Sequence, residues 1–313
     1  MRQPGVTNPK PCRSLAVRLF SLLSIFLTRP FAMALAITAF ATSAQAQSIC
    51  SANGVQLQIL GSGGPFGSGR ASAGYLLWID GQSRLMVDAG GGTFARFHEA
   101  GANLQDLELL ALSHFHPDHS AELPALLWPQ NGELTISGPS GSAEFPSVDA
   151  YLDGLLGPNG VFRVLNQRFD IDSVMIDVGS PATEVLSSDS MTISAKGVPH
   201  GDVPTLAYRV ETSAGSIAFS SDQNGSDPSF TEFVQGVDVL VVHFAGNEDG
   251  SGRGDLHAKP SVWGKIASDA NVGRLVLSHL MSNQNIENNV DALKQVWTGP
   301  LTIAEDLMCL EIK

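Results

Sequence analysis

The amino-acid sequence predicts an α/β fold on two observations. Short apolar or alternating runs typical of strands recur along the chain, and stretches typical of helices separate them. Several strand-like runs also end in histidine or aspartate, and α/β folds build their sites in the loops after strands. The alternation alone fits more than one α/β architecture.

The first 46 residues have the pattern of a secretory signal. Their start is basic, residues 30–42 are apolar, and residues 44–46 read Ala-Gln-Ala, a small-residue cleavage site. We expect a periplasmic or secreted protein whose mature domain spans residues 47–313; the alternative is that the apolar run stays as an amino-terminal anchor. No later segment approaches the roughly 18 apolar residues of a membrane span, so we expect no membrane contact after cleavage.

The mature chain is strongly acidic. Five of the 18 basic residues and none of the 31 acidic residues precede residue 47, so 13 basic residues face 31 acidic ones after cleavage. A nucleic-acid binder is expected to carry a basic patch, and residues 137–160 contain neither Lys nor Arg. We therefore expect no nucleic-acid partner.

The two cysteines of the mature chain stand near its ends, because Cys12 leaves with the signal. In an oxidising compartment Cys50 and Cys309 could form a disulfide that ties the terminal strands together. The alternative is a pair of buried free thiols.

Residues 55–60 alternate as a strand and run into a glycine-rich loop at residues 61–69. The loop is not a dinucleotide-binding fingerprint, because Phe66 stands at the place of the third glycine and no helix follows. A hairpin over residues 73–79 and 84–87 comes next, closed by an Asp-Gly turn.

Asp88 is the first polar residue after this hairpin. In metal sites a carboxylate commonly accepts the spare N–H of a ligating histidine, which fixes the histidine tautomer. The alternative is a cap for a helix predicted over residues 93–100.

The strongest chemical signal follows a buried strand predicted over residues 107–112. Three histidines and an aspartate fall within six residues there: His114, His116, Asp118 and His119. Imidazoles together with a carboxylate suit zinc best, and iron, manganese and cobalt accept the same donors. The alternative is a polar loop whose histidines cap the strand end.

The rest of the chain continues the alternation of strands and helices. The sequence predicts helices over residues 121–128 and 147–156, and strands over residues 135–139, 162–175, 183–187, 191–197, 205–211, 216–220, 237–243 and 274–278.

The His-x-His-x-Asp-His pattern of residues 114–119 resembles the metallo-β-lactamase superfamily of binuclear metallohydrolases. The resemblance covers about residues 55 to 312, nearly the whole mature chain. The order of the motifs is similar to the ribonuclease Z and metallo-arylsulfatase branch, with matching segments at residues 61–63, 87–90, 220–222, 241–243, 277–279 and 303–306. Asp222 departs from the lactamase branches, which use Cys or Ser.

The resemblance implies a four-layer αββα sandwich, in which two mixed sheets pack face to face with helices outside. It also implies two zinc ions per chain, with manganese or iron as the other options. The implied ligands are His114, His116 and His200 for the first ion, Asp118, His119 and His279 for the second, and Asp222 between them. Taken alone, His200 would be a surface or core histidine and Asp222 the start of an Asx turn.

The resemblance also implies catalytic roles. Asp118 and Asp222 would orient or deprotonate a metal-bridging hydroxide, and His257 would protonate the leaving group. In ribonuclease Z a glutamate partners that histidine; Phe244 stands at its place here, so an exposed loop histidine is the alternative for His257. We expect His243 to be a strand-end residue with a satisfied hydrogen bond.

The expected function is hydrolysis of small-molecule esters, with phosphodiesters or aryl sulfates ahead of lactones and other acyl esters. The alternative is a non-catalytic metal-binding member. A di-iron oxygen-reducing member would carry Glu in place of His116, and the Gly-x-Ser-x-Gly pattern of a serine hydrolase is absent from the sequence. The branch also suggests a homodimer.

Overall fold

Two seven-stranded sheets form the centre of the protein in the computed structural model, which describes residue 50 and residues 53–128, 130–251 and 254–312. In the first sheet the order is β14-β1-β2-β3-β4-β5-β6. These strands are β1 (Val55–Gly61), β2 (Gly74–Ile79), β3 (Gln82–Val87), β4 (Leu109–Ala111), β5 (Gly132–Pro139), β6 (Phe169–Ile176) and β14 (Cys309–Glu311).

In the second sheet the order is β13-β12-β11-β10-β9-β8-β7. These strands are β7 (Thr183–Ser187), β8 (Met191–Val198), β9 (Thr205–Thr212), β10 (Ser216–Phe219), β11 (Val239–His243), β12 (Arg274–Ser278) and β13 (Leu301–Ile303). Both sheets are mixed, because antiparallel hairpins on one side continue into parallel strands on the other.

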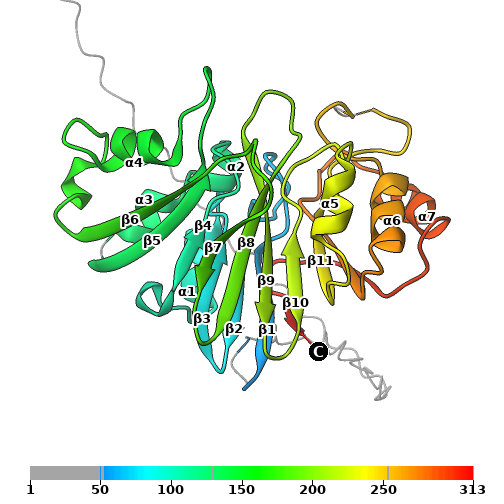
Figure 1. The fold of residues 1–313 in the computed structure, drawn as a ribbon, viewed down its shortest axis with the longest axis horizontal. Coiled ribbons are helices and arrows are strands. Elements are labelled where there is room, and N and C mark those ends of the chain that lie inside the picture. The colour runs from blue at the N-terminus through cyan, green and yellow to red at the C-terminus, as the bar shows by residue number, and fades with distance from the viewer. Residues whose placement is uncertain (1–49, 51–52, 129, 252–253, 313) are drawn as a thin grey trace, which may run out of the picture. The chain divides into compact units, whose positions relative to one another are not determined.

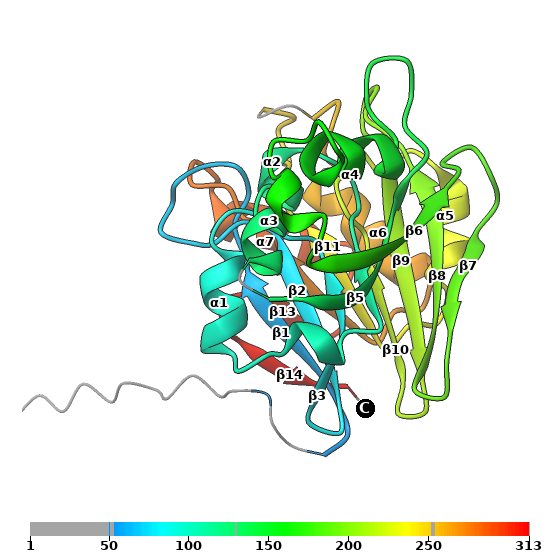
Figure 2. The ribbon, with the colours of Figure 1, turned by 90° about the vertical axis from the view of Figure 1, so that its left-hand side faces the viewer.

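Helices cover the outer face of each sheet (Figure 1). Figure 2 shows α1 (Thr93–Glu99), α3 (Leu123–Leu127) and α4 (Val148–Leu156) over the first sheet. The second sheet is covered by α5 (Pro228–Phe233), α6 (Pro260–Asp269) and α7 (Ile286–Lys294). The short α2 (Pro117–Ser120) lies at the upper edge in Figure 1. The layers are those of the metallo-β-lactamase fold, so the predicted αββα sandwich is confirmed.

Strand β2 shows why this sequence gives four layers. Successive side chains of a strand point to opposite faces, so Tyr75 and Leu77 enter the core between the sheets, while Leu76 and Trp78 pack under the outer helices. A strand with apolar residues at every position needs cover on both faces. The sandwich supplies that cover.

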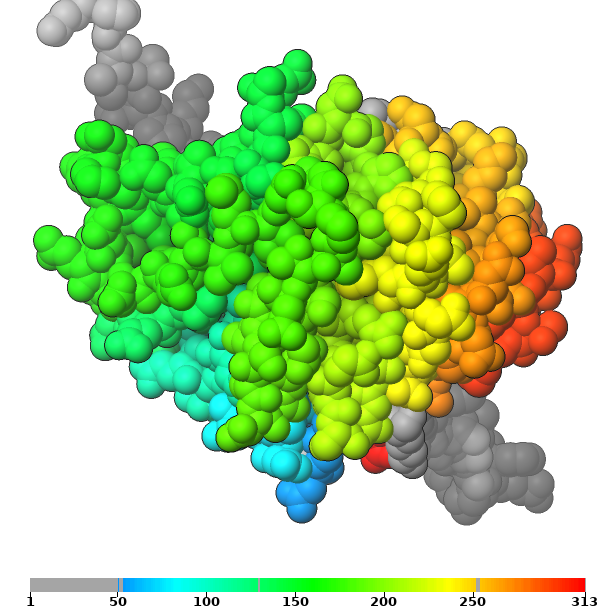
Figure 3. Space-filling view, viewed as in Figure 1, coloured from blue at the N-terminus to red at the C-terminus, as the bar shows by residue number. Residues whose placement is uncertain are grey.

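One predicted strand is wrong in its first half. The sequence predicted a strand over residues 162–175, but a 3-10 turn occupies Arg163–Leu165 and β6 begins at Phe169. Two apolar residues in the first half of the predicted strand are largely in solvent, since Phe162 is 41% exposed and Val164 is 61% exposed. Figure 3 shows this bright green part of the chain at the left-hand edge.

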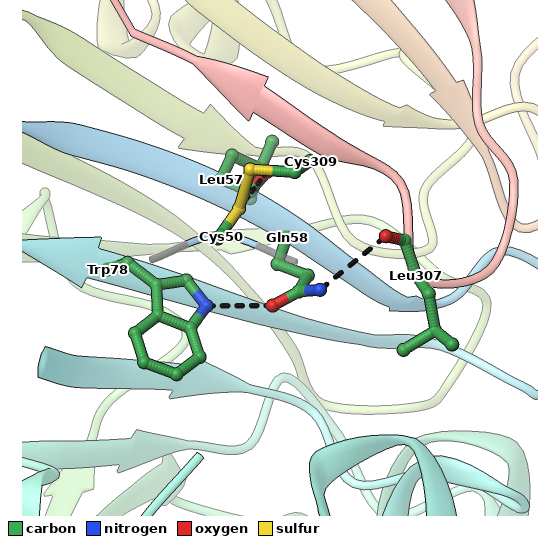
Figure 4. The surroundings of a disulfide bond; sticks show 6 residues. All are labelled: Cys50, Leu57, Gln58, Trp78, Leu307 and Cys309. Atoms are coloured by element: carbon green, nitrogen blue, oxygen red, sulfur yellow. Dashed lines mark hydrogen bonds between the residues drawn. A yellow bond between two sulfur atoms is a disulfide. The ribbon is translucent and has the colours of Figure 1, made fainter. Parts of the chain in front are cut away.

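A disulfide joins Cys50 to Cys309, with 5.5 Å between their Cα atoms (Figure 4). It ties the segment before β1 to β14, which pairs with β1, so the disulfide prediction is confirmed. Beside it, Gln58 accepts a hydrogen bond from the Trp78 indole N–H at 2.9 Å and donates to the Leu307 carbonyl at 3.5 Å. Strand β1 is thereby fixed to the segment that carries β14.

The predicted signal over residues 1–46 lies outside the described residues. Within the part of the chain that the structure describes, no helix has the length and apolar character needed to cross a bilayer.

The disulfide closes a loop of 259 residues, so its removal should widen the unfolded ensemble. We expect the Cys50→Ser, Cys309→Ser double variant to lose about 2–5 kcal/mol of unfolding free energy in urea titrations. A reductant should destabilise the parent and leave the double variant unchanged. Equal stability of parent and double variant in oxidising buffer would contradict this prediction.

Candidate metal centre

The site forms where four strands of the two sheets end at a common edge. His114 to His119 follow β4, His200 follows β8, Asp222 follows β10 and His279 follows β12. Hydrogen bonds across the two sheets hold this edge together: Leu206 N–H donates to the Ser113 carbonyl at 2.9 Å, and the Tyr208 hydroxyl donates to the Leu112 carbonyl at 3.1 Å. All seven predicted ligands are therefore brought to one place.

The first group of donors comprises His114, His116, His200 and Asp222, whose ligand atoms all lie within 4.8 Å of one another. His114 Nε2 is 3.0 Å from His116 Nδ1. Asp222 Oδ2 is 4.0 Å from His114 Nε2 and 3.6 Å from His200 Nε2.

The second group contains His119, His279, Asp118 and again Asp222. The Nε2 atoms of His119 and His279 are 3.2 Å apart, and Asp118 Oδ2 is 3.2 Å from His279 Nε2. Asp222 approaches this group with both oxygens, Oδ2 at 3.6 Å from His119 Nε2 and Oδ1 at 3.5 Å from His279 Nε2. The Asp222 carboxylate therefore lies between the two groups.

The donor atoms fit metal ions. Two nitrogens bound tetrahedrally to zinc at its usual bond length lie about 3.3 Å apart, close to the 3.0 and 3.2 Å pairs found here. His200 Nε2 is buried and has no hydrogen-bond partner among the described residues, although its Nδ1 donates to the Leu256 carbonyl at 3.1 Å. A cation bound at this place would supply the partner that this buried nitrogen lacks.

Electrostatics also favour a cation at this place. Burial and the neighbouring imidazoles lower the pKa of His114 well below its usual value, so the imidazole is neutral, the form that binds metals. Burial opposes ionisation of Asp118, but its hydrogen bond to His279 and the nearby imidazoles lower its pKa to about 2. Burial likewise opposes ionisation of Asp222, yet the surrounding histidines hold its pKa well below normal.

Asp88 orients the second group. Its carboxylate accepts hydrogen bonds from the Ser113 amide at 2.8 Å, the Ser113 hydroxyl at 2.9 Å and His119 Nδ1 at 2.8 Å. The alternative cap does not form, because Gly92 occupies the N-cap of α1 without a side-chain hydrogen bond. Asp88 therefore fixes the tautomer of His119 and leaves Nε2 free to face the other donors.

Two partners were missed by sequence reasoning. The Ser113 hydroxyl donates a hydrogen bond to Asp88, and its oxygen lies 3.0 Å from His114 Nδ1. A serine beside a motif carries no distinguishing signal in the sequence. Tyr75 lies in β2, where its aromatic ring predicts only core packing, yet its hydroxyl is 3.0 Å from His243 Nε2. His243 Nδ1 in turn lies 2.8 Å from Asp222 Oδ1.

His243 is thus engaged on both ring nitrogens, in line with the strand-end role expected from the sequence. Because Asp222 is ionised and only accepts, His243 Nδ1 carries the proton and Nε2 accepts the Tyr75 hydroxyl. The Tyr75 hydroxyl also lies 3.0 Å from Ser278 Oγ, to which it can donate instead. One ring nitrogen of His243 also lies within 4.8 Å of ligand atoms of His119, Asp222 and His279.

Backbone strain concentrates at the site. Asp88, Ser221 and His279 have φ angles of 59°, 53° and 55°, in the left-handed region that side chains other than glycine seldom adopt. Such conformations persist where surrounding contacts enforce them, and they gather at functional sites.

A cavity of about 410 Å³ opens onto the donors. Its lining includes five of them together with His257, and the other lining residues are Pro65, Phe66, Pro117, Ala245, Asn247, Leu256, Met281 and Asn283. His257 is only 7% exposed, and burial lowers its pKa to about 4. It is therefore not the exposed loop histidine of the alternative, although its Nδ1 has no partner within the described ranges.

Replacement of Asp88 by asparagine should weaken metal binding about 10–100-fold, because His119 loses the carboxylate that orients it. Titration with zinc by calorimetry would measure the change. Asp177→Asn is the matched control, since the Asp177 carboxylate accepts hydrogen bonds from Gly179 and Ser180 of its own turn and belongs to neither donor group. Equal affinities of the two variants would show that Asp88 does not support the site.

Comparison with known proteins gives one family match and several relatives. The model of the Beta-lactamase superfamily domain matches residues 83–280. A protein named ribonuclease Z from Mycobacterium bovis is 28% identical over 279 residues, covering 82% of this chain and 98% of its own. The probable metallo-hydrolase YhfI of Bacillus subtilis is 23% identical over 254 residues, covering 80% of this chain and 97% of its own.

Solved structures agree on the fold. The crystal structure of Bacillus subtilis YhfI superposes with a TM-score of 0.67 at 22% identity and covers 82% of this chain and 98% of its own. The short form of human tRNase Z gives a TM-score of 0.62 at 19% identity, covering 82% of this chain and 99% of its own.

Proposed function

Since the chain belongs to the beta-lactamase superfamily and is a metal-dependent hydrolase of ester bonds, we propose that two zinc ions serve it in hydrolysing small esters. Phosphodiesters and aryl sulfates come first among the substrates, and lactones and other acyl esters second. One observation carries the proposal: the Asp222 carboxylate lies between two separate groups of donors. A single ion would need only one group.

The residues present assign a role to each part of the site. His114, His116 and His200 would hold one ion and Asp118, His119 and His279 the other, with Asp222 shared. When bound, such ions lower the pKa of water toward neutrality and neutralise negative charge in the transition state.

The chain's own groups then position the reactants. Asp118 is ionised and reaches the cavity, so its carboxylate can orient a water molecule and accept its proton. His257 lines the same cavity, where its ring N–H can donate a hydrogen bond to the leaving oxygen. Buried Phe244 replaces the glutamate that the ribonuclease Z resemblance would supply, so His257 acts without that partner.

Nucleic acid is the second candidate substrate. Relatives named ribonuclease Z favour it, which weighs against the expectation of no nucleic-acid partner. The acidic composition of the chain and a cavity lining without Lys or Arg favour the smaller esters. We keep small esters as the first proposal.

We also propose that the protein is exported. The disulfide between Cys50 and Cys309 supports export, because disulfides form and persist in oxidising compartments. The homodimer rests on the resemblance alone.

The replacement His114→Ala should lower turnover about 1,000-fold or more, since a metal ion supplies several kcal/mol of transition-state stabilisation. The assay is a panel of a phosphodiester, an aryl sulfate, a lactone, a β-lactam and a structured RNA, run with zinc-loaded protein and with a chelated sample. His98→Ala is the matched control, because His98 is exposed and belongs to neither donor group.

Parent-like rates for His114→Ala on every hydrolysed substrate would overturn the assignment of this site. Hydrolysis of the RNA alone would replace small esters by the second candidate.

A further inference from the structure

The lining of the cavity over the donors also includes apolar residues that are not donors. We call five of them, Pro65, Phe66, Ala245, Leu256 and Met281, the apolar wall; Pro117 also lines the cavity, between His116 and Asp118 in the chain. Phe66 is 55% exposed although it lines the cavity, so much of this residue faces solvent. Exposed aromatic rings at the mouth of a pocket commonly serve to bind ligand.

The loop that carries Phe66 is anchored to the site. The Leu280 amide donates to the Ser62 carbonyl at 2.8 Å, Gly63 forms a β-bridge with Leu280, and the Ser72 hydroxyl donates to the Gly64 carbonyl at 3.0 Å. Leu280 directly follows His279, so one short segment carries both a donor and the support of the loop.

Gly64 makes this approach possible. A Cβ atom placed there would lie 2.9 Å from His279 Cε1 and 2.9 Å from Met281 Sδ. The backbone two residues before Phe66 thus packs directly against a donor and against the apolar wall. These contacts anchor the loop beside the donors two residues before Phe66.

The polar residues that line the cavity limit the charge of the ligand that it can bind. Apart from the donors and His257, the polar residues that line it are Asn247 and Asn283, and none of its lining residues is Lys or Arg. Among the described residues, the cavity lining offers no cation to a polyanionic chain. An ester with at most one negative charge and an apolar substituent matches the donors on the one hand and the apolar wall on the other.

We propose that the apolar wall, through Phe66, Leu256 and Met281, binds an aryl group of the ester and makes the enzyme selective for aryl over methyl esters. The proposal rests on the proposed function and names the substrate class of that site. Phe66 offers a ring for stacking or edge contact, and the Met281 thioether is polarisable and packs well against aromatic rings.

The test compares a phenyl and a methyl ester of the same acid in the parent, Phe66→Ala and Phe66→Leu. The selectivity is the ratio of the two kcat/KM values, and division by the parent's ratio cancels the different reactivities of the leaving groups. We expect Phe66→Ala to reduce the selectivity about tenfold. Phe66→Leu, which keeps an apolar side chain, should retain most of the parent's selectivity for the phenyl ester.

Trp128→Ala is the control, because Trp128 is 47% exposed but does not line the cavity. Zinc content should be equal in all variants. A selectivity that is unchanged in Phe66→Ala and also in the Phe66→Ala, Met281→Ala double variant would overturn the proposal.

A binding measurement separates this proposal from the proposed function. Calorimetry with phenylphosphonate and methylphosphonate on the zinc-loaded protein needs no turnover, and the phenyl compound should bind more tightly to the parent but not to Phe66→Ala. If the parent hydrolyses no ester yet shows this difference, the proposed function fails and the aryl site stands. Equal affinities for the two phosphonates in the parent would overturn the aryl site whatever the activity.

Discussion

The carboxylate of Asp222 is the contact on which the rest of the site depends. Its two oxygens lie between 2.8 and 4.0 Å from nitrogens of His114, His119, His200, His243 and His279. Five buried imidazoles around one buried carboxylate would be a costly arrangement without cations to share. The surrounding structure is arranged to hold that carboxylate, and burial together with neighbouring imidazoles keeps His114 in the neutral form that binds metals.

The sandwich supplies this support from both of its sheets. Asp222 follows β10 of the second sheet, and the network behind it passes through His243 in β11 to Tyr75 in β2 of the first sheet. On the opposite side, Asp88 follows β3 and orients His119. Each donor group is thus supported by residues from elsewhere in the chain, and the disulfide fixes the edge of the first sheet from which this support extends.

The sequence predicts the donors because their signals are local. His114 to His119 form a dense motif after a buried strand, and His200, Asp222 and His279 each follow a strand in the expected order. The fold class follows from the same motif, since alternation of strands and helices fits several architectures.

The supporting contacts could not be predicted, because they arise from tertiary structure. Ser113 and Tyr75 are ordinary residues whose roles depend on neighbours 25 and 168 positions away. The first half of the strand predicted over residues 162–175 failed because the apolar side chains of Phe162 and Val164 face solvent, which periodicity does not show. In the sequence, Phe66 argues only against a dinucleotide-binding loop. That Phe66 lines the cavity over the donors follows from the tertiary contacts of its loop.

A crystal structure of the zinc-loaded protein, with anomalous scattering recorded at the zinc edge, would locate the ions around Asp222. We predict two anomalous peaks per chain, one among His114, His116 and His200 and one among Asp118, His119 and His279, with Asp222 in contact with both. A single peak, or zinc bound away from Asp222, would contradict it.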